Sequence, residues 1–133
     1  MLNHKLLIAD DQPDVRRLLR MSLGYGKYRL LEADNGEAAL AIARAEQPEI
    51  VVLDVMMPGR LDGLDVCRAL KDDPATAGAY VVLLTARGQA GDALAGRAAG
   101  ADAYMIKPFS PTRLIEVIER RAAPHVTVRA YGH

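Results

Sequence analysis

Ile50-Val51-Val52-Leu53-Asp54, at residues 50–54, is the most informative stretch of this 133-residue chain. Its first four residues are all aliphatic, so neither face of an extended segment would present a polar side chain. Such a run is typical of a central strand that is covered on both faces, as in parallel sheets whose crossover helices lie on both sides. Asp54 ends the run and would place a carboxylate at the carboxyl end of that buried strand.

Four further apolar runs lie before and after this stretch, at intervals of roughly 20 to 30 residues, about the length of one strand–helix unit. The five predicted strands are Lys5–Ala9, Tyr28–Ala33, Ile50–Val55, Tyr80–Thr85 and Ala103–Ile106. The alternation of strands with longer helical patterns predicts an α/β fold built around a parallel sheet.

Helical patterns fill the segments between and after the strands. Four helices have clear start signals, which are Pro13, Asn35, Asp62 and Ser110 with Pro111. A fifth helix is predicted at about Gln89 to Ala99. It contains Gly91 and Gly96 and should be the least stable, because glycine costs roughly 1 kcal/mol relative to alanine in a helix interior.

The composition describes one compact domain and excludes several classes of function. Seventeen basic residues balance 17 acidic ones, so neither nucleic acid nor an anionic membrane would attract the chain through bulk charge. No apolar stretch approaches the roughly 18 to 20 residues of a membrane span, and no signal-peptide pattern is present, so we expect a cytoplasmic protein. The one cysteine, Cys67, cannot form an internal disulfide and is expected to be a small buried side chain.

Polar side chains lie at the carboxyl ends of four of the five predicted strands, where an open parallel sheet collects its functional groups. They are Asp10 and Asp11, Asp54, Thr85 and Lys107. Each residue alone has a simple structural explanation, such as a helix cap or a solvated charge, but the combination favours a site. Three adjacent carboxylates would repel one another unless a cation lay among them, and Lys107 supplies only one positive charge. Oxygen ligands without histidine or cysteine favour Mg²⁺ that keeps several waters.

A divalent cation beside a carboxylate, a hydroxyl and an ammonium group is suited to phosphoryl transfer, which depends on positioning and charge neutralisation. The chain has no glycine-rich Gly-x-x-x-x-Gly-Lys-Ser/Thr loop, so a nucleotide is not the obvious donor. The candidate acceptor is therefore a carboxylate that would become an acyl phosphate.

Five motifs in this order and at this spacing resemble the receiver domain of two-component response regulators. They are Asp10-Asp11, Val51 to Gly59, Leu83 to Ala86, Gly100 to Tyr104 and Lys107 to Phe109. The resemblance covers about residues 4–122. It implies a flavodoxin-like, doubly wound, five-stranded parallel sheet of order 2-1-3-4-5 with five helices. It also implies a single receiver domain at residues 1–122, followed by a C-terminal tail or linker stub at 123–133.

The resemblance also implies which residues hold the metal ion and accept the phosphoryl group. Asp54 would be the phosphoacceptor. Asp11 and Asp54 would be direct Mg²⁺ ligands together with the backbone carbonyl of Met56. Asp10 would support the ion through a water molecule.

The remaining motifs imply a conformational switch. Lys107 would pair with Asp54 and later with the phosphoryl oxygens, and Thr85 would donate its hydroxyl to the phosphoryl group. Tyr104 would be the aromatic partner of Thr85 in the switch. The peptide bond between Lys107 and Pro108 would be cis.

The partners implied by the resemblance are a sensor histidine kinase or a phosphotransfer protein as donor, and an output domain or partner protein as target. It also allows a phosphorylation-dependent dimer. Direct contact with nucleic acid or a membrane is not expected. Such a protein is a signalling switch that catalyses only its own phosphoryl transfer and a slow dephosphorylation.

Two departures from the family pattern stand out. The loop from Pro58 to Gly63 is one residue longer than the common Pro-Gly-x-Asp-Gly form, and Tyr80 stands where many receivers have a proline. On the predicted first helix, Arg16, Arg17 and Arg20 form either a partner-docking face or a solvated face.

Three other functions share parts of this pattern. A phosphatase of the haloacid dehalogenase type also uses a strand-end aspartate, but it needs a second aspartate two residues later, where this chain has Met56. A flavin-binding flavodoxin would need phosphate donors in its first loop, which here is acidic. A degenerate receiver that serves only for docking is disfavoured, because the acids, the hydroxyl and the lysine are all present.

Overall fold

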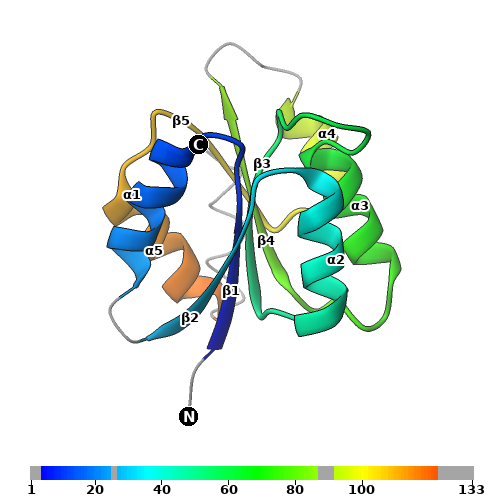
Figure 1. The fold of residues 1–133 in the computed structure, drawn as a ribbon, viewed down its shortest axis with the longest axis horizontal. Coiled ribbons are helices and arrows are strands. Elements are labelled where there is room, and N and C mark those ends of the chain that lie inside the picture. The colour runs from blue at the N-terminus through cyan, green and yellow to red at the C-terminus, as the bar shows by residue number, and fades with distance from the viewer. Residues whose placement is uncertain (1–3, 25–26, 87–91, 123–133) are drawn as a thin grey trace.

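A computed structural model describes residues 4–24, 27–86 and 92–122. The described strands form one parallel sheet of five strands in the order β2-β1-β3-β4-β5, as the resemblance implies (Figure 1). Their bounds are β1 His4–Ala9, β2 Tyr28–Ala33, β3 Ile50–Asp54, β4 Tyr80–Ala86 and β5 Ala103–Lys107. Each of the five predicted strands is confirmed to within one or two residues at either end.

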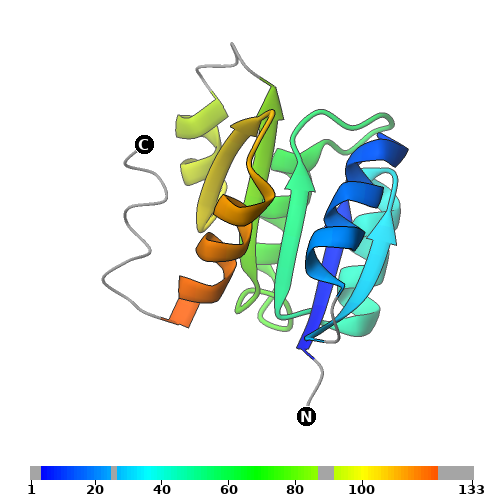
Figure 2. The same cartoon turned by 90° about the vertical axis from the view of Figure 1, so that its left-hand side faces the viewer.

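Helices cover both faces of this sheet. The helices in the described residues are α1 Pro13–Leu23, α2 Gly36–Glu46, α3 Gly63–Asp72, α4 Asp92–Ala98, α5 Pro111–Glu119 and a short 3₁₀ helix η1 Arg120–Ala122. Helices α1 and α5 lie on one face, and α2, α3 and α4 lie on the other (Figures 1 and 2). None of the helices in these residues is both long and apolar enough to cross a membrane.

The core consists of two apolar layers, one on each face of the sheet. Side chains alternate between the faces along each strand, so Val51 and Leu53 pack under α2 and α3, whereas Ile50 and Val52 pack under α1 and α5. All five residues of β3 are buried. The central position predicted for this strand is therefore confirmed, and Asp54 extends from the best-covered strand of the sheet.

The predicted helix starts are confirmed in atomic detail. Asn35 Oδ1 accepts the backbone N–H of Ala38 (2.8 Å), and Asp62 forms a reciprocal capping box with Asp65. Ser110 accepts the N–H of Arg113. The fifth predicted helix is α4, which begins at Asp92, and the predicted residues 89–91 lie outside the described residues, as does the predicted tail at 123–133.

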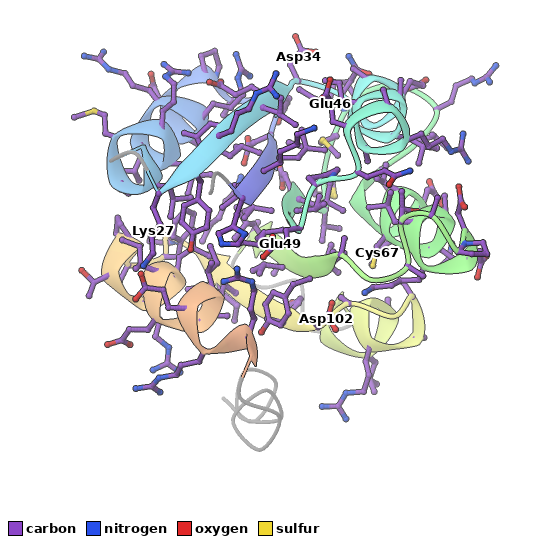
Figure 3. The ribbon with its side chains drawn as sticks, turned by 90° about the horizontal axis from the view of Figure 1, so that it is seen from below. Lys27, Asp34, Glu46, Glu49, Cys67 and Asp102 are labelled. Atoms are coloured by element: carbon purple, nitrogen blue, oxygen red, sulfur yellow. The ribbon has the colours of Figure 1, made fainter. Side chains whose placement is uncertain are left out.

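The amino ends of the strands lie at the underside of the molecule, which Figure 3 views from below with Glu49 labelled. Glu49 precedes β3, and its carboxylate contacts the His4 ring and accepts the guanidinium of Arg121 (2.8 Å). These contacts connect the start of β1 with the end of the last described helix. The functional groups predicted above lie at the other end of the sheet.

Candidate functional site

Three carboxylates converge at the carboxyl ends of the adjacent strands β1 and β3. Oxygen atoms of Asp10, Asp11 and Asp54 all lie within 4.8 Å of one another. Asp10 and Asp54 are buried, with 0% and 4% of their surface exposed, whereas Asp11 is exposed. This cluster of hard oxygen donors, open to solvent on one side, suits a divalent cation that keeps part of its water shell.

Asp10 is held by the protein through all of its polar atoms. Its backbone N–H donates to Ala33 O on β2 (3.1 Å), and its Oδ1 accepts the N–H of Gln12 (2.9 Å). Its backbone carbonyl accepts Arg16 Nη1 (2.8 Å), and its Oδ2 accepts Lys107 Nζ (2.7 Å). Asp10 therefore closes the turn that leads into α1. Gln12 is the N-cap residue of that helix and makes no side-chain cap.

Lys107, the last residue of β5, reaches across the end of the sheet to this cluster. Only 17% of its side chain is exposed, and its Nζ lies 2.7 Å from Asp10 Oδ2 and 3.4 Å from Asp54 Oδ2. It also donates to Gln12 Oε1 (3.3 Å). The ammonium group thus lies closer to Asp10 than to Asp54. The peptide bond between Lys107 and Pro108 is cis.

Burial raises the pKa of Asp54 to about 6, and the negative charge of Asp10 adds to that effect. The Lys107 ammonium and the N–H of Met56, which donates to Asp54 Oδ1 (3.2 Å), oppose the rise in pKa without cancelling it. The pocket therefore holds more negative charge than its own cation compensates. Adding a divalent cation would relieve this excess.

The loop between β3 and α3 carries Met56 beside Asp54 and is fixed by close backbone contacts. Gly63 N–H donates to Val55 O (2.9 Å), and a Cβ at Gly63 would lie 2.2 Å from the backbone oxygen of Asp54. Only glycine fits this position, because a side chain would displace the residue that carries the buried carboxylate. The side chain of Met56 points to solvent and is 61% exposed.

The longer loop predicted from the sequence packs against the start of α2. Gly59 adopts φ +96° beside the carboxylate of Glu37. Glu37 Oε2 accepts the N–H of Arg60 (3.1 Å), and this hydrogen bond lowers the pKa of Glu37. Leu61 O closely approaches Gly36. This part of the loop therefore lies against the first turn of α2.

Thr85 and Tyr104 lie on neighbouring strands and on the same face of the sheet. Thr85 is fully buried near the end of β4 and pairs with Ile106, while Tyr104 pairs with Leu83. Because residues two apart along a strand face the same side, both side chains point toward the face covered by α2, α3 and α4. Tyr104 is partly buried there against the core.

Two features of the site were not predicted from the sequence. The first is the contact of Arg16 with the backbone of Asp10, and the second is the packing of the Pro58–Gly63 loop on Glu37. Arg16 lies six residues after Asp10 and one turn into the helix, and this spacing could have indicated its contact with Asp10. The second depends on the path of a loop, for which the sequence carries no periodic signal.

Comparison with known proteins gives one consistent result. The family model of the response regulator receiver domain matches residues 6–119. The chain is 44% identical over 121 residues to the probable transcriptional regulator ycf27 of Porphyra purpurea, and 39% identical over 122 residues to the transcriptional regulatory protein ResD of Bacillus subtilis. These alignments cover 89% and 90% of this chain but 48% and 49% of those proteins, so the chain spans about half the length of these curated relatives.

Solved structures agree with the fold. A putative response regulator from Chloroflexus aurantiacus superposes with a TM-score of 0.84 at 34% identity, covering 90% of this chain and 97% of that one. The beryllofluoride-activated receiver domain of DrrB superposes with a TM-score of 0.79 at 30% identity, with the same coverage. In both cases the similarity extends over almost the whole of the other chain.

Proposed function

Because this chain belongs to the family of response regulator receiver domains, we propose that Asp54 accepts the phosphoryl group. A domain of this family is a switch for phosphorylation-dependent signalling and not a conventional enzyme. The observation that carries this proposal is the placement of Asp54. It is the buried carboxylate at the end of the central strand, and it lies beside both other acids and Lys107.

In the proposed reaction, one carboxylate oxygen of Asp54 attacks the phosphorus atom of the donor. A bond forms between that oxygen and phosphorus, and the bond from phosphorus to the donor breaks, with its electron pair leaving on the donor. The product is an acyl phosphate on Asp54. Lys107 Nζ lies 3.4 Å from Asp54 Oδ2, and in this proposal it neutralises charge on the transferred group.

We assign the metal site to Asp11, Asp54 and the backbone carbonyl of Met56, with Asp10 acting through water. Asp11 is the exposed member of the acidic cluster, and Asp10 already accepts hydrogen bonds on both carboxylate oxygens. Mg²⁺ matches this all-oxygen donor set and, when bound, neutralises negative charge on the oxygens of the transferring group.

Thr85 and Tyr104 form the proposed switch. A phosphoryl group on Asp54 offers the Thr85 hydroxyl a new acceptor, and movement of Thr85 changes the space available to the Tyr104 ring on the same face of the sheet. A ligand shifts such an equilibrium only by its differential affinity for the two states. Phosphorylation would thereby favour one of two packings.

The donor in this proposal is a sensor histidine kinase or a phosphotransfer protein. The curated relatives named above are described as transcriptional regulators, and this chain spans about half their length. We infer that the signal passes to an output domain or partner protein, and that a phosphorylation-dependent dimer is one form in which it does so.

The test is phosphorylation by acetyl phosphate with and without Mg²⁺, followed by intact-protein mass spectrometry. Wild-type protein and Asp34→Asn should each gain one phosphoryl group, whereas Asp54→Asn should gain none. Asp34 is a matched control, because it is an exposed aspartate just after β2, at the same end of the sheet. If Asp54→Asn is labelled as much as wild type, Asp54 is not the phosphoacceptor. If wild type is labelled equally with and without Mg²⁺, the reaction does not require the metal ion.

A further inference from the structure

The side chain of Arg16 bridges three elements around the acidic cluster. Its Nη1 donates to the backbone carbonyl of Asp10 at the end of β1 (2.8 Å), and its Nε lies 3.3 Å from Glu32 Oε1 on β2. Only 20% of the side chain is exposed. The side chain is therefore part of the site's framework and not one of the solvated arginines of α1.

Glu32 orients this guanidinium group. Besides its contact with Arg16, its two carboxylate oxygens both accept Arg20 Nη1, each at 2.8 Å. Arg20 lies one helical turn after Arg16, so the two arginines hold the carboxylate from the same helix face. The guanidinium of Arg16 is planar, and its position is set by a hydrogen-bond acceptor on one side and an ion-pair partner on the other.

Two hydrogen bonds fix the backbone on both sides of Asp11. Arg16 holds the carbonyl of Asp10, which precedes Asp11, and Asp10 Oδ1 holds the N–H of Gln12, which follows it. The carboxylate of Asp11 itself makes no hydrogen bond or ion pair within residues 4–24, 27–86 and 92–122. Its position therefore depends on the two peptide groups that flank it.

We propose that Arg16 is a positioning residue for metal binding, which holds the turn that presents Asp11 to the ion. This inference rests on the proposed metal role of Asp11. Partners that orient metal ligands contribute about 10- to 100-fold to metal affinity in other proteins. We expect Arg16→Gln to weaken Mg²⁺ binding about tenfold.

For Arg16→Gln, the loss of positioning and the loss of charge predict opposite changes in Mg²⁺ affinity. Removing a positive charge near three carboxylates should by itself strengthen the binding of a cation. The matched control is Arg17→Gln, because Arg17 is the next residue on α1, is exposed, and loses the same charge. Mg²⁺ should bind Arg17→Gln as tightly as wild type or slightly more tightly.

The experiment is a Mg²⁺ titration of the unphosphorylated full chain, followed by amide NMR shifts, together with acetyl phosphate labelling rates at increasing Mg²⁺. Arg16→Gln should raise the Mg²⁺ concentration for half-maximal rate about tenfold and leave the rate at saturating Mg²⁺ close to wild type. Arg16→Lys keeps the charge but lacks the planar fork, and it should show most of the same loss of affinity.

Glu32→Gln keeps Arg16 but removes its ion-pair partner, which also holds Arg20, so it provides a milder test if Arg16→Gln folds poorly. It should weaken Mg²⁺ binding in the same direction but less. Equal Mg²⁺ affinity of Arg16→Gln and Arg17→Gln would overturn the proposal, as would a reduced rate at saturating Mg²⁺. Absence of Mg²⁺ binding by the wild-type protein would instead overturn the metal site on which the proposal rests.

Discussion

At the scale of single residues, the surroundings of the buried Asp54 destabilise its ionised form. Burial and the neighbouring Asp10 raise its pKa to about 6, above its ordinary value of 3.8. A carboxyl group with a raised pKa binds its proton more tightly in the folded protein than in the unfolded chain. Its favourable contribution to folding is therefore present at low pH and is lost as the pH rises through about 6.

Asp54→Asn should consequently stabilise the protein at pH 7 in the absence of metal. The shift from 3.8 to about 6 corresponds to at most about 3 kcal/mol. Urea unfolding in EDTA at pH 4 and pH 7 measures this difference, which should be much smaller at pH 4, where the carboxyl of the folded wild-type protein is protonated. An Asp54→Asn protein that is less stable than wild type at pH 7 would show that the charged carboxylate supports the fold.

Asp11→Ala should leave the metal-free stability unchanged or slightly raised, because Asp11 caps no helix and its removal relieves repulsion among the acids. Added Mg²⁺ should then fail to raise the thermal midpoint as it does for wild type. Asn35→Ala is the matched control, since Asn35 does cap α2 and its loss should cost about 1 kcal/mol. A clear fall in the metal-free midpoint of Asp11→Ala would identify Asp11 as a structural residue.

At the scale of elements, the turn from β3 into α3 depends on contact between two backbones. Gly63→Ala would place a Cβ 2.2 Å from the carbonyl oxygen of Asp54. Such overpacking costs about 1–3 kcal/mol and would move Asp54, the proposed phosphoacceptor. We expect a lower free energy of unfolding together with slower labelling by acetyl phosphate.

Gly78→Ala is the control for this prediction, because a Cβ there meets no atom within 4 Å. Its stability should stay within about 1 kcal/mol of wild type, with unchanged labelling. If Gly63→Ala is as well tolerated as Gly78→Ala in both measurements, the close approach does not constrain the site.

The elements also show what could be predicted from the sequence. The continuous apolar run of Ile50–Leu53 indicates a central strand covered on both faces, which the structure has. Helix starts could also be predicted, because their capping side chains bond to nearby backbone groups, as at Asn35, Asp62 and Ser110. The contacts of Arg16 and Glu37 could not be predicted in this way. They join segments distant in sequence through long side chains, whose reach allows many partners.

At the scale of the whole molecule, the switch should act through one side of the sheet. Thr85 and Tyr104 both face the layer of α2, α3 and α4, and α4 is a helix of only seven residues with Gly96 inside it. A differential stabilisation of about 3 kcal/mol would change the ratio of two packings roughly a hundredfold. A short helix that contains glycine is suited to move at that cost.

Hydrogen exchange with and without beryllofluoride, which stands in for the phosphoryl group, tests this route. Protection should change most between residues 85 and 110, and the same experiment on Asp54→Asn should show no change. Changes centred instead on residues 12–47 would place the signalling surface on α1 and α2 and refute the route through β4 and β5.

The excess of carboxylates in the acidic cluster also has a kinetic consequence. Lys107 contacts Asp10 and Asp54 but not Asp11, so the carboxylates of the cluster outnumber the ammonium group that contacts them. A phosphodonor is itself an anion, so we expect repulsion to slow its encounter with this pocket until a divalent cation has bound. We therefore expect a preferred order of addition, in which the metal ion binds before the donor. In that order, the concentration of free Mg²⁺ would set how often a collision with the donor is productive.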